Sequence, residues 1–197
     1  VQLLIRLIDN PANRQSGKTS KSEIMPNQEQ LRIIEYNRIL QNPWSSREAL
    51  VTAYYNRAVA YIDLDQFQKA VSDLDKAISL GAHDSCVYHN LGYAKHQLLD
   101  FKGAINAYDL AILIDPTSAL SYQERGDTRL DMNDFQGALP DYNMAITLDS
   151  QLCEAYAGRG CAKHKLGDHK GAFSDFSKAL ALNPRSKYAF IKRALLK

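Results

Sequence analysis

Three carboxylates, Glu124, Asp127 and Asp131, have the spacing in this sequence that most clearly favours binding chemistry. They are separated by three and four residues, so on a helix they lie on one face. A stripe of negative charge of this kind can bind the ammonium group of a lysine or the guanidinium group of an arginine in a partner protein. A solvated helix face produces the same pattern, so both interpretations stay open.

The histidines and the one Gly-Lys segment do not form the sets of side chains that catalysis or metal binding requires. His89 and His96 are seven residues apart, about 10 Å along a helix, which is too far for both to bind one metal ion. The segment SGKTS at 16–20 has Ala12 where a phosphate-binding loop needs a glycine. We therefore expect no catalytic residue, no cofactor and no metal, and we do not expect an enzyme.

Composition and charge are those of an ordinary soluble chain. Of 197 residues, 45% are apolar and 23% are charged, and no apolar run approaches the ~20 residues of a membrane helix. Residues 51–197 carry seventeen lysines or arginines and seventeen aspartates or glutamates. This balance argues against a nucleic acid as the main partner, because phosphate binding needs concentrated positive charge. The three cysteines include no C-x-x-C pair, so a reducing compartment, the cytoplasm, is the simplest expectation.

The elements that must position these side chains follow from a repeat of 34 residues. Units begin at Val51, Ser85, Ala119 and Cys153 without insertion or deletion. In these units position 4 is tyrosine, positions 20 and 27 are alanine, and position 24 is bulky: Leu74, Tyr108, Tyr142 and Phe176. Apolar or small residues recur at spacings of three and four, which predicts two helices per unit, at about positions 2–14 and 17–30. A repeat of this length indicates a solenoid.

The first 50 residues do not follow the repeat. Residues 1–26 are predicted to form an N-terminal arm or linker. Residues 27–50 are predicted to form a capping helix and its connection to the array. The apolar face of this helix consists of Leu31, Ile34 and Leu40. The first helix of the array is expected to begin near Ser46, because SSRE at 45–48 has the Ser-x-x-Glu spacing of a capping box.

The segments LGYAKHQLLDFKGAINAYDLAILIDP (Leu91–Pro116) and RGCAKHKLGDHKGAFSDFSKALALNP (Arg159–Pro184) resemble tetratricopeptide repeats. The resemblance covers 51–197 and implies an all-α fold, a right-handed superhelical solenoid of antiparallel helix pairs. The expected repeats are 51–84, 85–118, 119–152 and 153–186, followed by a capping helix or a truncated fifth repeat at 187–197. The resemblance implies a non-enzymatic adaptor that binds a peptide or helix of a partner protein in its concave groove. A self-associating assembly factor and a module of a larger protein remain alternatives.

The groove of this family is lined by the first helix of each repeat, at positions 2, 5, 9 and 12, with 6 and 13 beside them. The candidate groove residues are therefore Tyr55, Asn56, Val59, His89, Asn90, Tyr93, His96, Gln123, Glu124, Asp127, Asp131, Cys161 and His164. Some members of the family bind the C-terminal carboxylates of chaperones through Lys, Arg and Asn side chains. Here Asn90 matches one such asparagine, but Tyr55, Val59, Leu120 and Glu124 replace the other clamp residues. We therefore do not expect this chain to bind chaperone tails.

Two further positions change together and predict structural ion pairs. Position 7 is arginine and position 23 is aspartate in three of the units, whereas the second unit has Leu91 and Ala107. Both positions lie at similar distances from the turn between the two helices, so pairing within a repeat is expected. The predicted pairs are Arg57–Asp73, Arg125–Asp141 and Arg159–Asp175.

Overall fold

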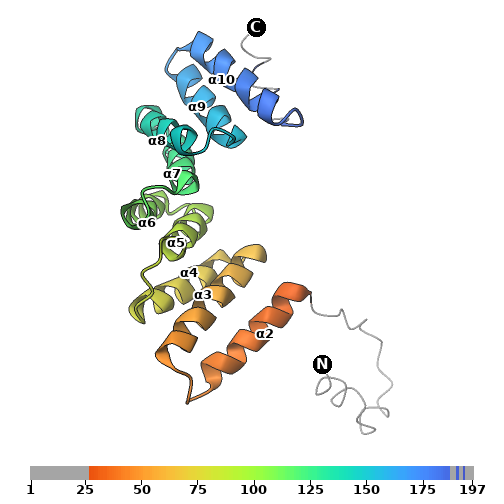
Figure 1. Cartoon of the computed structure of the whole chain (residues 1–197), viewed down its shortest axis with the longest axis vertical. Coiled ribbons are helices and arrows are strands. Elements are labelled where there is room, and N and C mark those ends of the chain that lie inside the picture. Colours follow the sequence, from red (N-terminus) through yellow and green to blue (C-terminus); the bar gives the residue numbers. More distant parts are fainter. Residues whose placement is uncertain (1–26, 187–189, 191–192, 194–197) are drawn as a thin grey trace, which may run out of the picture.

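The computed structural model describes residues 27–186, 190 and 193, and the regular elements within 27–186 are α-helices (Figure 1). The expectations for residues 1–26 and for most of 187–197 fall outside the described residues. The helices are α2 (Gln28–Gln41), α3 (Arg47–Asp63), α4 (Phe67–Ser79), α5 (Ser85–Gln97), α6 (Phe101–Ile114), α7 (Ala119–Asp131), α8 (Phe135–Leu148), α9 (Cys153–Lys165) and α10 (His169–Leu182).

These helices stack as pairs in one curved array. Helices α3 and α4, α5 and α6, α7 and α8, and α9 and α10 pack as the two helices of each expected repeat, and α2 packs on α3. The first helices of successive pairs also contact one another, from α3 to α5, α7 and α9, whereas no two successive second helices within 27–186 do so. The first helices therefore lie on the inner side of the curve (Figure 1).

The core of each repeat is a large side chain enclosed by small ones. The position 24 side chains Leu74, Tyr108, Tyr142 and Phe176 are at most 1% exposed. The alanines at positions 20 and 27 are fully buried around them. Gly92 lets α5 approach the ring of Tyr108 so closely that an added Cβ would lie 2.7 Å from its Cε1 atom. The sequence pattern of small and bulky residues thus sets the spacing of the two helices in a repeat.

The second helices begin with a recurring cap. Asp100, Asp134 and Asp168 each accept a hydrogen bond from the backbone N–H of the glycine three residues later, as expected for N-cap residues. In the first repeat Gln66 occupies the cap position without such a bond. There Lys69 stands in place of the glycine and donates to the Gln66 side chain at 2.8 Å.

The turn between the two helices of a repeat needs a left-handed backbone at position 15. The φ angles are 55° at Asp65, 63° at Leu99, 61° at Asn133 and 87° at Gly167. Aspartate, asparagine and glycine adopt this conformation readily, whereas leucine does not. Leu99 is also 72% exposed, so it is held in an unfavourable conformation without a compensating contact in the core.

Helix α2 and the N-cap of α3 each differ in one detail from the prediction. Its half-buried side is formed by Ile33, Tyr36, Asn37, Ile39 and Leu40, and the expected face residues Leu31 and Ile34 are 45% and 42% exposed. The periodicity of a short helix with apolar residues on more than one side does not specify which side meets its neighbour.

Helix α3 begins after Ser46, as predicted, but Ser46 itself accepts from the Ala49 N–H, and the expected Ser45–Glu48 box is not the cap. Within the described residues, no helix is long and apolar enough to cross a bilayer.

Candidate functional site

The three predicted Arg–Asp pairs are present and lie within single repeats. Each guanidinium makes a short ion pair with an aspartate that is at most 7% exposed. The distances are 2.6 Å for Arg57–Asp73, 2.6 Å for Arg125–Asp141 and 2.7 Å for Arg159–Asp175. In the second repeat, Leu91 and Ala107 are both buried instead. The pairs hold the two helices of a repeat together and are structural.

The same arginines also reach the preceding helix pair, which the sequence did not predict. A second guanidinium nitrogen donates to a residue of the preceding second helix, or of α2 in the first repeat. These contacts are Arg57–Asn37 at 2.5 Å, Arg125–Asp109 at 2.5 Å and Arg159–Asn143 at 2.7 Å. Asp109 and Asn143 both occupy position 25, but Asp75 of the first repeat has no arginine opposite it in the repeat register. Because position 25 holds different residue types, the sequence alone did not indicate this contact between repeats.

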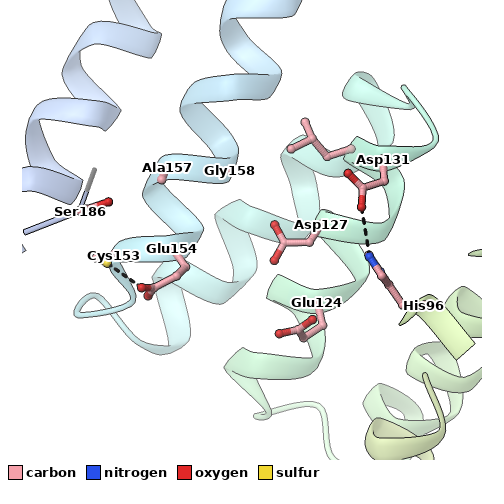
Figure 2. A pocket seen from close by; sticks show the side chains of 10 residues that line it. His96, Glu124, Asp127, Asp131, Cys153, Glu154, Ala157, Gly158 and Ser186 are labelled. Carbon is pink, nitrogen blue, oxygen red and sulfur yellow. Dashed lines mark hydrogen bonds and ion pairs between the residues drawn. The ribbon is translucent and has the colours of Figure 1, made fainter. Parts of the chain in front are cut away.

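The predicted acidic stripe lines a pocket between α7 and α9. The pocket has a volume of about 460 Å³ and includes Glu124, Asp127 and Asp131 of α7, with His96 of α5. Figure 2 shows these side chains around the space between α7 and α9. The rest of the lining consists of Leu130, Cys153, Glu154, Ala157, Gly158 and Ser186. We call this set the acidic pocket.

Glu154 is a fourth carboxylate that the spacing along one helix did not place in the stripe. It lies at position 2 of the fourth repeat, and its Oε1 atom accepts from the Cys153 thiol at 3.0 Å. Burial raises the pKa of that thiol to about 11. Because Glu154 faces Glu124 only through the stacking of two repeats, a search for spacings of three and four residues cannot find it.

Asp127 and Asp131 each have a polar neighbour in the acidic pocket. The Tyr142 hydroxyl donates to Asp127 Oδ1 at 2.6 Å, yet burial still raises the pKa of Asp127. His96 Nε2 lies 3.1 Å from Asp131 Oδ2, and His96 Nδ1 lies 2.8 Å from the Thr128 hydroxyl. Because that hydroxyl donates to the Glu124 carbonyl, it accepts from His96.

Glu124 has no such neighbour. Within residues 27–186 no group donates a hydrogen bond to its carboxylate. Burial, and then the negative charge of Asp127, raises the pKa of Glu124 to about 7. The acidic pocket therefore contains a carboxyl group whose pKa is raised and that the described residues do not satisfy.

A second pocket, of about 450 Å³, opens between α3 and α5. It is lined by Val51, Thr52, Tyr55, Ala82, Asp84, Ser85, Cys86, Val87 and Ile114. The Tyr55 hydroxyl accepts from Asn90 at 3.2 Å, so the one asparagine that matches the chaperone clamp is bound within the array. The predicted groove residues Asn56 and Val59 are half-buried on α3, and Tyr93 packs edge-to-face on Phe67.

Other predicted groove residues are used inside the array. Gln123 is 6% exposed and Cys161 is 7% exposed. Cys161 packs with Ala172 and Phe176, so little of its side chain is open to a ligand. His89 lies against Ser121, and burial lowers its pKa. These positions lie on the sides of the first helices that pack against neighbouring helices. The family pattern does not distinguish these packed sides from the open face.

His164 lies apart from both pockets. Its Nδ1 atom is 3.1 Å from Nδ1 of His169, at the turn between α9 and α10. Residues 27–186, together with 190 and 193, contain no group of three or more His, Cys, Asp or Glu side chains that could hold a metal ion.

A family model of the tetratricopeptide repeat matches residues 51–81, 87–118 and 154–186. A comparison with curated proteins finds no match. Among solved structures, the tetratricopeptide domain of Arabidopsis OM64 is 32% identical, with a TM-score of 0.57, and the match covers 57% of this chain and 93% of that domain. The chain belongs to the tetratricopeptide repeat family.

Two further solved structures show the fold over different lengths. The structure of YrrB, described as having an unusual peptide-binding site, is 18% identical with a TM-score of 0.71, covering 82% of this chain and 81% of YrrB. The second such domain of human RPAP3, in complex with the HSP70 peptide SGPTIEEVD, is 28% identical with a TM-score of 0.54. That match covers 55% of this chain and 91% of the domain. Domains of this family are typical protein-interaction modules.

Proposed function

We propose that this chain is a non-enzymatic adaptor whose inner face binds an extended or helical segment of a partner protein. The observation that carries the proposal is the position of the two pockets described above. Both open between successive first helices, one between α3 and α5 and the other between α7 and α9. A segment lying across the inner face would fill both in turn. The proposal includes a cytoplasmic location, which rests on the cysteine pattern of the sequence alone.

The likeness to peptide-binding domains supports the proposal, but the ligand must differ in charge. The peptide bound by the human RPAP3 domain carries two glutamates and a C-terminal aspartate. At the positions where chaperone-binding members have basic clamp residues, this chain has Leu120 and Glu124. An acidic peptide would meet the acidic pocket with like charge, which is unfavourable. We therefore propose a partner other than a chaperone tail.

A display selection of random twelve-residue peptides on the full chain tests the proposal. Selected peptides are then titrated into the ¹⁵N-labelled chain, and we expect the amide shifts to fall on α3, α5, α7 and α9. Leu120→Arg, on α7, should weaken binding at least tenfold, whereas the matched Leu113→Arg on α6 should leave the affinity within twofold. Both leucines are exposed, at 52% and 76%, so neither change disturbs the core.

Two results would refute the proposal. One is that no peptide is selected above background. The other is that the shifts fall on α4, α6 and α8. Light scattering of the same sample separates the adaptor from a self-associating assembly factor, since an adaptor stays monomeric when peptide is added.

A further inference from the structure

The acidic pocket differs from the rest of the molecule in how its carboxylates are neutralised. The buried aspartates Asp73, Asp141 and Asp175 each have an arginine within 2.7 Å. In contrast, no lysine or arginine of the described residues lines the acidic pocket, although four carboxylates do. Of these four, Glu124 and Asp127 are half-buried, whereas Asp131 and Glu154 are exposed. Burying a carboxylate without a cation is costly. Glu124 and Asp127 therefore carry a desolvation penalty that arginine side chains offset at the buried aspartates elsewhere in the array.

Two buried oxygen atoms near Glu124 and Asp127 also lack a hydrogen-bond partner within the described residues. The Gln123 side chain is 6% exposed, and its Nε2 atom lies 3.5 Å from Asp127 Oδ2. Its Oε1 atom has no hydrogen-bond partner within the described residues. The Tyr108 hydroxyl is likewise buried without a partner in that part of the chain, and the charges of Glu124 and Asp127 add to the burial that raises its pKa. Native proteins satisfy nearly all buried polar groups, so these atoms, gathered at one carboxylate pair, indicate an incomplete site.

The shape of the pocket results from small residues on α9. Positions 5 and 6 are Tyr55 and Asn56 in the first repeat, but Ala157 and Gly158 in the fourth. A Cβ added at Gly158 would collide with the ring of Tyr142. Ala157 and Gly158 thus place no more than a methyl group on the α9 wall of the pocket (Figure 2). A long side chain from outside can therefore enter between α7 and α9.

We propose that the acidic pocket binds the basic side chain, arginine or lysine, of the segment held on the inner face. This inference rests on the proposed function and names the chemistry of the partner. The cation would lie between Glu124, Asp127 and Glu154, for which the described residues provide no lysine or arginine in the pocket lining. A guanidinium presents five N–H donors and an ammonium three, so either can contact carboxylates from two helices at once.

A titration with small probes tests the inference directly. Nα-acetyl-arginine methylamide is added to the ¹⁵N-labelled full chain, and the isosteric but neutral Nα-acetyl-citrulline methylamide is the matched probe. We expect saturable shifts of the Ala157 and Gly158 amides with the arginine compound and at least tenfold weaker binding of the citrulline compound. The double variant Glu124→Gln/Asp127→Asn should weaken arginine binding at least tenfold.

The control variant Glu35→Gln/Asp75→Asn removes the same charge from exposed sites on α2 and α4 and should bind within twofold of the wild type. Equal binding of both probes, or equal loss in both double variants, would overturn the inference.

The selected peptides separate this inference from the proposed function. Peptides that bind the inner face without a basic residue, and with unchanged affinity for the double variant, would refute the basic ligand and leave the adaptor proposal standing. If no peptide binds the inner face, both proposals fail, even where the arginine compound alone still binds the pocket. Selected peptides that lose at least tenfold in affinity when their arginine or lysine is replaced by glutamine would support both.

Discussion

Replacing Glu124 by glutamine should stabilise the free protein while weakening its ligand binding. The pKa of Glu124 is raised from 4.5 to about 7, so the folded state holds its proton more tightly than the unfolded state. Each pKa unit corresponds to about 1.4 kcal/mol, which gives a penalty of about 3 kcal/mol for the ionised group. Because the side chain is only half-buried, we expect about 1–3 kcal/mol to be measured.

The sign of this effect sets its pH window. Below pH 4.5 the carboxyl group is protonated in both states, and it has no effect on the free energy of unfolding. Between pH 4.5 and about 7 the folded state binds more protons, so the Glu124 contribution to stability falls as pH rises. Above pH 7 the penalty is complete. Glu124→Gln should therefore match the wild type at pH 4 and exceed its stability at pH 8.

Urea unfolding at pH 4, 6 and 8 measures this difference. The groups that face Glu124 remain in both proteins: Asp127 and Asp131 of α7, His96 of α5, Tyr108 of α6, and Cys153 and Glu154 of α9. Their titration therefore cancels to first order in the comparison. Glu35→Gln, on the exposed side of α2, is the control and should show no such pH dependence. A Glu124→Gln variant that is equally or less stable than the wild type at pH 8 would refute the reasoning.

Three other changes should affect stability alone. Asp141→Ala strands the Arg125 guanidinium in a site where the aspartate is 2% exposed, and should cost about 3–5 kcal/mol in urea unfolding; a loss below 1 kcal/mol would show that the pair is dispensable. Leu99→Gly relieves the strain of a φ of 63° at an exposed turn. It should raise the free energy of unfolding by about 0.5–1 kcal/mol, measured as a higher Tm in calorimetry, whereas a lower Tm would show that Leu99 is not strained. Gly92→Ala places a Cβ 2.7 Å from the Tyr108 ring and should cost about 1–3 kcal/mol by the same unfolding assay, while a neutral effect would mean that the ring can move.

The fold was predictable because the same pattern of small and bulky residues recurs in each repeat. Tyrosine at position 4, alanine at positions 20 and 27 and a bulky residue at 24 define one helix pair, and the covariation of positions 7 and 23 locates the Arg–Asp pairs. The acidic stripe on α7 was also predictable, since its residues share a single helix. The position of Glu154 opposite this stripe was not, because it depends on how neighbouring repeats stack. Helix α2 carries no repeat, so its packed side depended on one weak pattern, and of the three residues expected there only Leu40 is half-buried.

The guanidinium contacts between repeats divide the array into two kinds of junction. Arg125 and Arg159 join the second repeat to the third and the third to the fourth, but Leu91 stands at that position between the first and second. There Leu91 belongs to one apolar cluster with Ala58 and Ala82 of the first repeat and with Val87 of its own helix. Added salt screens charge pairs, whereas cooling weakens apolar contacts. In a quasi-one-dimensional array, each junction sets how far unfolding spreads. Salt should therefore loosen first the junction between the second and third repeats, where Arg125 pairs with Asp109, and cold the junction between the first and second.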